Sequence, residues 1–149
     1  MKILGIGSNY VSDLKDLEEK RKAKKFIFSK PESSLAVNCD VVYPSDITNE
    51  LIYEIELVIK IGKEGKNITK ETANSYISEI AVGIDYTATD LLNDARETKH
   101  PWDFAKGFDG AAPISSFKSI AEYPNLDDIN FDLKINGEEK QRSNTAYMI

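Results

Sequence analysis

Apolar and polar residues alternate over several short stretches of the chain, a pattern typical of strands with one buried face. We expect four strands from this pattern: KILGIGSNY (2–10), KFIFSKP (25–31), AVNCDVVYP (36–44) and LIYEIELVIKIG (51–62). Pro31 and Pro44 stop the second and third, because proline cannot donate to a sheet. A later stretch, FDLKINGEEKQ (131–141), predicts a hairpin that turns at Asn136-Gly137, the pair that tight hairpin turns favour.

Helical spacing is less common along the chain. The clearest helix is expected in TKETANSYISEI (69–80), with Thr69 as its N-cap and Glu71 in the first turn. AVGIDYTATDLL (81–92) reads as a strand that turns into a helical segment ended by Pro101, while residues 10–24 show only a loose apolar spacing. Strands outnumber helices, so the sequence predicts an α+β, mainly β fold with about two short helices.

Composition and charge narrow the setting. The 149 residues fit one domain, and the net charge of -6 with a pI near 4.9 argues against a nucleic-acid partner. The basic cluster KRKAKK (20–25) favours a solvated helix end or a mobile loop over a binding patch, because the acidic DLKDLEE (13–19) precedes it.

A single cysteine, Cys39, fits a reducing compartment. The start of the chain lacks the pattern of a signal peptide, and no apolar run approaches the ~20 residues of a membrane span. We therefore expect a cytoplasmic protein without a membrane partner.

Two carboxylates interrupt the longest strand pattern. Glu54 and Glu56 are two residues apart, so they project from the same face of the strand, opposite Tyr53, Ile55 and Leu57. Adjacent carboxylates repel each other unless a cation lies between them. The alternative interpretation, which we keep open, is a strand with one ordinary solvent-exposed face.

Two further charged residues occur in unusual surroundings. Asp85 lies in an apolar run just before a strand-to-helix turn, and Lys106 stands alone among aromatic and small residues, in what we read as another strand. Three carboxylates with one lysine describe a site for a hard cation and an anionic substrate.

Several blocks of the sequence resemble, in the correct order, the fumarylacetoacetate hydrolase family. The blocks are SNY (8–10), FSKP (28–31), YEIELVIKIGK (53–63), GIDYTATDLL (83–92), PWDFAKGFDGAAPIS (101–115) and INGEEKQRSNTAYMI (135–149). The resemblance covers nearly the whole chain and implies a mixed β-roll, usually dimeric, with a divalent metal in the active site. It also implies one domain over residues 1–149, with a first strand and possible lid in 1–30 and the metal-site core in 31–149.

The resemblance carries over to individual residues. It implies Glu54, Glu56 and Asp85 as ligands of Mg²⁺, or of Mn²⁺ or Ca²⁺, and Lys106 as the active-site lysine. Lys30 and Thr145 match family positions near the pocket and are expected to bind substrate, a small anionic 2-oxo acid. Asp90 is expected to support the metal loop without binding the ion.

The chain departs from the family near its start. Hydrolytic members typically carry N-Y-x-x-H-x-x-E, whose histidine–glutamate pair activates water. Here Asp13 and Asp16 take the two positions as candidate catalytic residues. An aspartate is a weaker base than a histidine near neutral pH. The arginine of a T-A-R-D pattern is also replaced, by Thr89, and Leu92 stands where acylpyruvate-cleaving relatives often have glutamine.

The chain also ends earlier than the family pattern, without the closing strands that follow the NTxxMI block, so we expect a truncated form. Two functions follow as hypotheses. The first is a metal-dependent enzyme acting on small 2-oxo or enol dicarboxylic acids by isomerisation, decarboxylation or C–C hydrolysis through a metal-stabilised enolate. The second is a degenerate member that keeps the metal site but serves as a binding or structural protein.

Overall fold

The computed structural model describes residues 1–149 and is rich in strands. The strands are β1 (Ile3–Gly7), β2 (Phe26–Lys30), β3 (Leu35–Val37), β4 (Leu51–Ile61), β5 (Ile77–Ala88), β6 (Ala112–Ile114), β7 (Lys118–Ser119), β8 (Asn130–Ile135) and β9 (Glu138–Asn144). The α-helices are α1 (Leu17–Lys22), α2 (Lys70–Ala73), α3 (Thr89–Thr98) and α4 (Asp103–Lys106). None of these helices combines the length and the apolar composition needed to cross a membrane.

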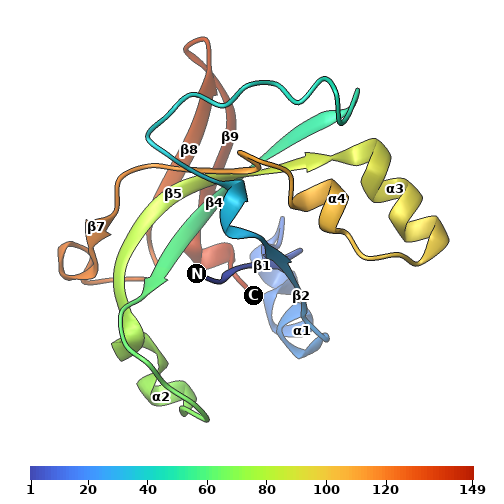
Figure 1. The fold of residues 1–149 in the computed structure, drawn as a ribbon. Helices are drawn as coiled ribbons and strands as arrows, with labels where there is room; N and C mark the ends of the chain where they lie inside the picture. The colour runs from blue at the N-terminus through green and yellow to red at the C-terminus, as the bar shows by residue number, and fades with distance from the viewer.

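A long antiparallel ribbon of β4 and β5 runs through the molecule (Figure 1). Its register extends from Leu51 opposite Ala88 to Ile61 opposite Ile77. The sheet has the order β3-β6-β5-β4, with β7 also paired to β5, so β4 forms an edge. Strand β5 leads directly into α3, and both β6 and β7 return to pair with β5, so this strand positions the elements that follow it.

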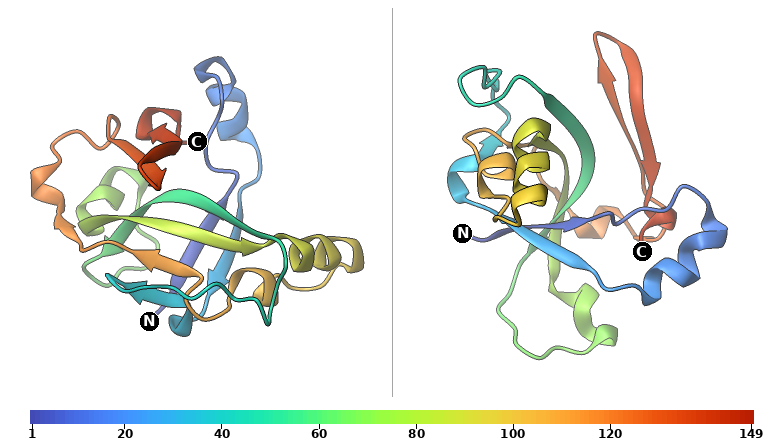
Figure 2. Two further views of the ribbon diagram at one scale, coloured as in Figure 1. Left: turned by 90° about the horizontal axis from the view of Figure 1, so that it is seen from above. Right: turned by 90° about the vertical axis from the view of Figure 1, so that its right-hand side faces the viewer.

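Two separate hairpins flank this sheet. In one, β1 pairs with β2, and the rings of Phe26 and Phe28 contact Trp102, which directly precedes α4. The other hairpin, β8 and β9, projects from the molecule, as Figure 2 shows most clearly on its right, and contacts β4. Helices α3 and α4 lie side by side, and α4 packs against β2.

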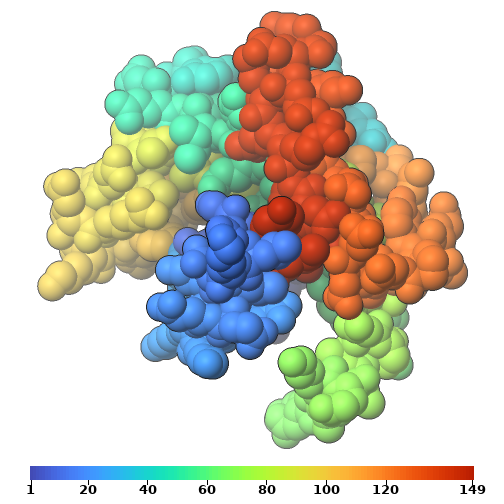
Figure 3. All heavy atoms as spheres, turned by 180° about the vertical axis from the view of Figure 1, so that it is seen from behind, coloured from blue at the N-terminus to red at the C-terminus, as the bar shows by residue number.

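The two ends of the chain meet. The backbone N–H of Val11 donates to the carbonyl of Tyr147 at 3.0 Å, and that of Ile149 donates to the carbonyl of Asn9 at 2.9 Å. In Figure 3 the blue N-terminal segment lies against the red C-terminal residues. The segment after β1 is therefore anchored on the residues after β9.

The apolar core is small and lies around the start of α3. Ala88 and Ala111 are fully buried, and they pack with Phe108 against Leu51, Tyr86 and Leu91. Several large apolar residues outside it stay exposed, among them Leu4, Ile6 and Ile27 on the outer face of the β1–β2 hairpin.

Most of the predicted strands are confirmed, and so is the β8–β9 hairpin. Asn136 and Gly137 both adopt positive φ, 52° and 83°, as the tight turn requires. The strand predicted for 36–44 is wrong beyond Val37, because Asn38 takes φ 48° and ends β3, leaving the following residues without a strand partner.

The helix predicted for 69–80 is also largely wrong. Only Lys70–Ala73 form an α-helix, followed by a single 3₁₀ turn, and Thr69 sits at the N-cap position without a side-chain cap bond. From Ile77 onward the chain is strand β5, because pairing with the full length of β4 outweighs the local helical spacing.

The approach of Phe28 to Gly5 gives a testable prediction. A Cβ atom on Gly5 would lie 2.3 Å from the Phe28 ring, so Gly5→Val should displace the ring and lower the free energy of unfolding by about 1–3 kcal/mol. Urea unfolding measures this loss. The matched control Leu4→Val, at an exposed neighbouring position, should stay within about 0.5 kcal/mol. A Gly5→Val protein as stable as the unaltered chain would contradict the packing of β1 on β2.

Candidate active site

Three carboxylates share one face of the β4–β5 ribbon. Glu54 lies directly opposite Asp85 in the antiparallel register, and Glu56 follows two residues later, opposite Gly83. Residues that pair directly across strands project to the same side, so the three side chains are neighbours. The Asp85 side chain is only 11% exposed, whereas that of Glu54 is 48% exposed.

Lys106 joins two of these carboxylates. Its Nζ lies 2.5 Å from Oδ2 of Asp85 and 3.2 Å from Oε2 of Glu54. The ammonium also lies 4.8 Å from the centroid of the Phe28 ring, a cation–π contact. The expectation of a strand at this position is wrong, because Lys106 is the last residue of α4. Its backbone N–H bonds to the carbonyl of Trp102, so the short helix orients the side chain towards β5.

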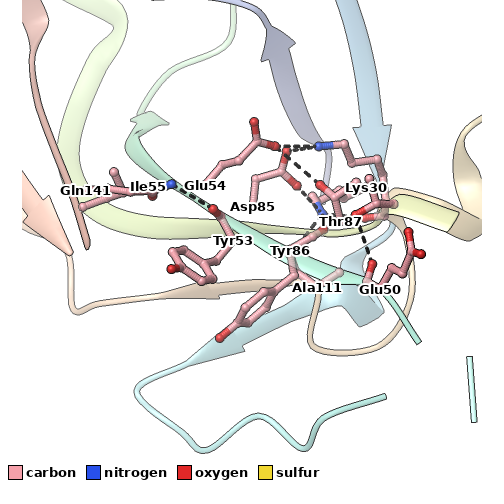
Figure 4. A network of polar contacts seen from close by, with 12 residues as sticks. Lys30, Glu50, Tyr53, Glu54, Ile55, Asp85, Tyr86, Thr87, Ala111 and Gln141 are labelled. Carbon is pink, nitrogen blue, oxygen red and sulfur yellow. Dashed lines mark hydrogen bonds and ion pairs between the residues drawn. The ribbon is translucent and has the colours of Figure 1, made fainter. Parts of the chain in front are cut away.

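Lys30, the last residue of β2, approaches from the other side of Asp85. Its buried Nζ lies 2.8 Å from Oδ1 of Asp85 and donates to the carbonyls of Tyr86, Lys106 and Ala111 at 3.2, 2.5 and 3.0 Å. Figure 4 shows Lys30 directed towards Asp85 and the neighbouring backbone. Burial lowers the pKa of Lys30, and the charge of Asp85 opposes that shift. These contacts use its three N–H bonds, so the ammonium presents none to a substrate.

The third carboxylate has no ion-pair partner. Burial, together with the negative charges of Asp85 and Glu54, raises the pKa of Glu56 to about 7. Tyr10 lies within the influence of Glu56. Burial, together with the negative charge of Glu56, raises the pKa of Tyr10 to about 12. Tyr10 and Phe28 therefore belong to the surroundings of the site, although their sequence blocks gave no signal that distinguished them from core aromatics.

The donor set fits a hard divalent cation, although the side chains do not converge on one point. No group of three or more His, Cys, Asp or Glu side chains in the structure is arranged to hold a metal ion. Glu54 and Asp85 instead turn to Lys106. The three carboxylates outnumber the two lysines, and Glu56 is the one without a lysine partner, which fits its raised pKa. The backbone positions of the three carboxylates are nonetheless neighbours on one face of the ribbon.

The remaining predicted residues lie outside this cluster. Asp13 caps the 3₁₀ turn Leu14–Asp16 by accepting from the N–H of Lys15, and Asp16 lies exposed in the same turn. Thr145 is buried, and its hydroxyl oxygen accepts from the N–H of Ile129 at 2.8 Å. None of these three forms a hydrogen bond or ion pair with the carboxylates.

Asp90 has a structural role at the entrance to β4. Its carboxylate accepts hydrogen bonds from the hydroxyl of Thr48 and from the N–H groups of Asn49 and Leu91. These bonds lower the pKa of Asp90 and tie the loop before β4 to the first turn of α3. This placement agrees with the expectation that Asp90 supports the site from outside.

Two hollows lie beside the cluster rather than over it. One, of about 410 Å³, is lined by Phe26, Phe28 and Trp102 among others, so the ring that contacts Lys106 forms part of its wall. The other, of about 380 Å³, is lined on the sheet by Ile55 and Ile84, on the face opposite the carboxylates.

Comparison with known proteins identifies relatives of this chain. The family model "Fumarylacetoacetate (FAA) hydrolase C-terminal" matches residues 2–149. The mitochondrial oxaloacetate tautomerase of Caenorhabditis elegans is 34% identical over 99% of this chain and 69% of its own length. The mitochondrial oxaloacetate decarboxylase of Dictyostelium discoideum is 32% identical, over 99% and 68%.

Among solved structures, a fumarylpyruvate hydrolase from Pseudomonas aeruginosa in complex with Mn²⁺ and pyruvate superposes with a TM-score of 0.87. It is 30% identical, over 99% of this chain and 66% of that protein. The chain thus spans about two thirds of the length of these relatives. The likeness confirms the expected strand-rich fold with few helices, and the match over residues 2–149 establishes that the chain belongs to the fumarylacetoacetate hydrolase family of enzymes.

Proposed function

We propose that this chain is, or is part of, a divalent-metal-dependent enzyme that acts on small 2-oxo or enol dicarboxylic acids. The observation that carries the proposal is the face of the β4–β5 ribbon on which three carboxylates adjoin two buried lysines. Such a face combines ligands for a hard cation with positive charge for an anionic substrate. The relative that binds Mn²⁺ and pyruvate supports both parts of this assignment.

Glu54, Glu56 and Asp85 would hold the metal. Carboxylate oxygens suit Mg²⁺, Mn²⁺ and Ca²⁺, and the structure does not distinguish among the three ions. When bound, the ion would act as a Lewis acid that polarises the carbonyl oxygen of the substrate and stabilises the enolate charge. Glu56 would lose its bound proton to serve as a ligand, because its raised pKa leaves it partly protonated near neutral pH.

Lys106 would stabilise negative charge on the substrate. Its ammonium is buried between Asp85 and the Phe28 ring, where water screens a charge little. A positive group held in such a place lowers the energy of a developing oxyanion without needing to reorganise. Lys30 supports this arrangement, because it binds both the carboxylate of Asp85 and the backbone carbonyl of Lys106. We assign direct substrate contact to Thr145 before Lys30, since the N–H bonds of Lys30 are already used.

Within this reaction class, we place isomerisation or decarboxylation ahead of C–C hydrolysis. Enolate chemistry needs the carboxylates and Lys106, whereas hydrolysis also needs a base that activates water. The two positions where hydrolytic members carry histidine and glutamate hold Asp13 and Asp16, which form no bond to the cluster. In this proposal, residues 8–24 are a lid that would bring the pair over the substrate.

The second candidate is a member that binds the metal without efficient turnover. The altered lid pair favours it, and the complete set of three carboxylates with Lys106 opposes it. From the family resemblance and the acidic net charge we also propose a cytoplasmic homodimer that needs neither nucleic acid nor membrane as a partner.

The metal assignment predicts a thermal shift. Mg²⁺ or Mn²⁺ should raise the melting temperature, because a ligand that binds only the folded state stabilises it, by about 2.7 kcal/mol at 100 times its dissociation constant. Glu56→Ala should abolish the shift in a melting experiment. Glu64→Ala, at an exposed loop residue after β4, should keep it. An equal shift in Glu56→Ala and in the unaltered chain would refute the ligand assignment.

The lid assignment predicts a gain of hydrolysis. Asp13→His combined with Asp16→Glu should raise acylpyruvate hydrolysis about 10²- to 10⁴-fold, the contribution of a well-placed general base. Oxaloacetate decarboxylation and keto–enol isomerisation, followed by ultraviolet absorbance, should change little. As a control, Glu18→His adds a histidine on α1 outside the motif and should leave hydrolysis unchanged. Brisk hydrolysis by the unaltered chain would count against the assignment.

A further inference from the structure

The backbone of β4 is held at the cluster by one side chain from a distant hairpin. The carboxamide of Gln141, in β9, accepts from the N–H of Ile55 at 2.8 Å through Oε1 and donates to the carbonyl of Tyr53 at 3.0 Å through Nε2. Figure 4 shows Gln141 at this stretch of β4. The two bonded backbone groups belong to the residues immediately before and after Glu54.

This contact replaces a missing strand. β4 is an edge strand, and a strand edge presents a row of N–H and C=O groups without sheet partners. An amide side chain carries one donor group and one acceptor atom side by side, as a neighbouring backbone would. Gln141 therefore takes the place of a neighbouring strand at the two backbone groups that flank Glu54.

The hairpin is shaped to present this side chain. The register of β8 and β9 places Leu133 opposite Gln141 and Lys134 opposite Glu139, so Lys140 is an extra residue in β9. A bulge of this kind bends a strand and re-aims the neighbouring side chain. Gln141 is half-buried as a result, whereas the residues before it in β9 are exposed.

We propose that Gln141 is a positioning residue that holds Glu54 and Glu56 in place across from Asp85 and Lys106. With the backbone bound on both sides of Glu54, the β4 edge cannot twist away, and the two glutamates keep their facing register. Loss of the amide would leave an unpaired N–H and C=O at the edge and free this stretch to move. The inference deepens the proposed function and rests on it for the metal, while the held backbone is independent of any ion.

The test compares Gln141→Met with Arg142→Met. Methionine matches glutamine in length but forms no such bonds, and the side chain of Arg142 hydrogen-bonds to Glu139 of the same hairpin. Nuclear magnetic resonance would follow the exchange of the Ile55 amide and the side-chain carboxyl carbons of Glu54 and Glu56, without metal. Titration with Mn²⁺ would follow affinity.

We expect Gln141→Met to speed exchange at Ile55, to shift or broaden both carboxyl signals and to weaken Mn²⁺ binding about 10- to 100-fold. Arg142→Met should change none of these. Faster exchange with unshifted carboxyl signals and unchanged affinity would overturn the positioning role. If the unaltered chain binds no Mn²⁺ while Gln141→Met still shifts the carboxyl signals, the proposed function fails and the positioning role stands. If Gln141→Met does not fold, Gln141→Asn carries the same comparison, since its amide is one methylene too short to reach both groups.

Discussion

The register between β4 and β5 is the constraint on which the rest of the molecule depends. It sets Glu54 opposite Asp85, and the side-chain period of two places Glu56 on the same face. A one-residue slip of β4 along β5 would turn Glu54 and Glu56 to the opposite face, away from Asp85, and would bring Ile55 to the face that now carries the carboxylates. The same backbone bonds between β4 and β5 thus fix the positions of the carboxylates on one face and of the apolar side chains on the other.

Buried charge is balanced around that register. Asp85 is nearly enclosed, and such a carboxylate is costly without compensating charge. Lys30 and Lys106 supply it from β2 and from α4, two elements that are brought together by the packing of Phe26 and Phe28 on Trp102. The uncharged aromatic rings of the β1–β2 hairpin therefore help to hold both lysines beside Asp85.

The sequence predicted those features that depend on neighbours along the chain. The alternation in 51–62, the Asn136-Gly137 turn and the shared face of Glu54 and Glu56 all follow from local rules, and the structure agrees. It did not predict that 77–80 would extend β5, because the partner that decides this, β4, is set by tertiary pairing. The contacts of Lys30 and the two bonds of Gln141 share this cause, since each joins residues far apart in sequence. Helix α4 was missed for another reason, because four residues are too few for a helical period to show. The family resemblance pointed to Glu54, Asp85 and Lys106, which the structure joins by ion pairs. No local signature showed that Asp13, Asp16 and Thr145 would form no bond to them.

The pairing of residues 9–11 with 147–149 has a consequence for the order in which the chain assembles. Val11 and Tyr147 are 136 positions apart (147 − 11), so their bond closes almost the whole chain into a loop. Closing so long a loop costs more chain entropy than closing the shorter loops of the β4–β5 ribbon and the β8–β9 hairpin. These local pairs can form early and the terminal contact late. In the folded protein the same bonds are few and peripheral, so they belong to the part of the molecule that opens first. Residues 12–24 follow Val11 directly, and their helical turns bury no side chain. Opening of the bonds between residues 9–11 and 147–149 would therefore free this segment to move.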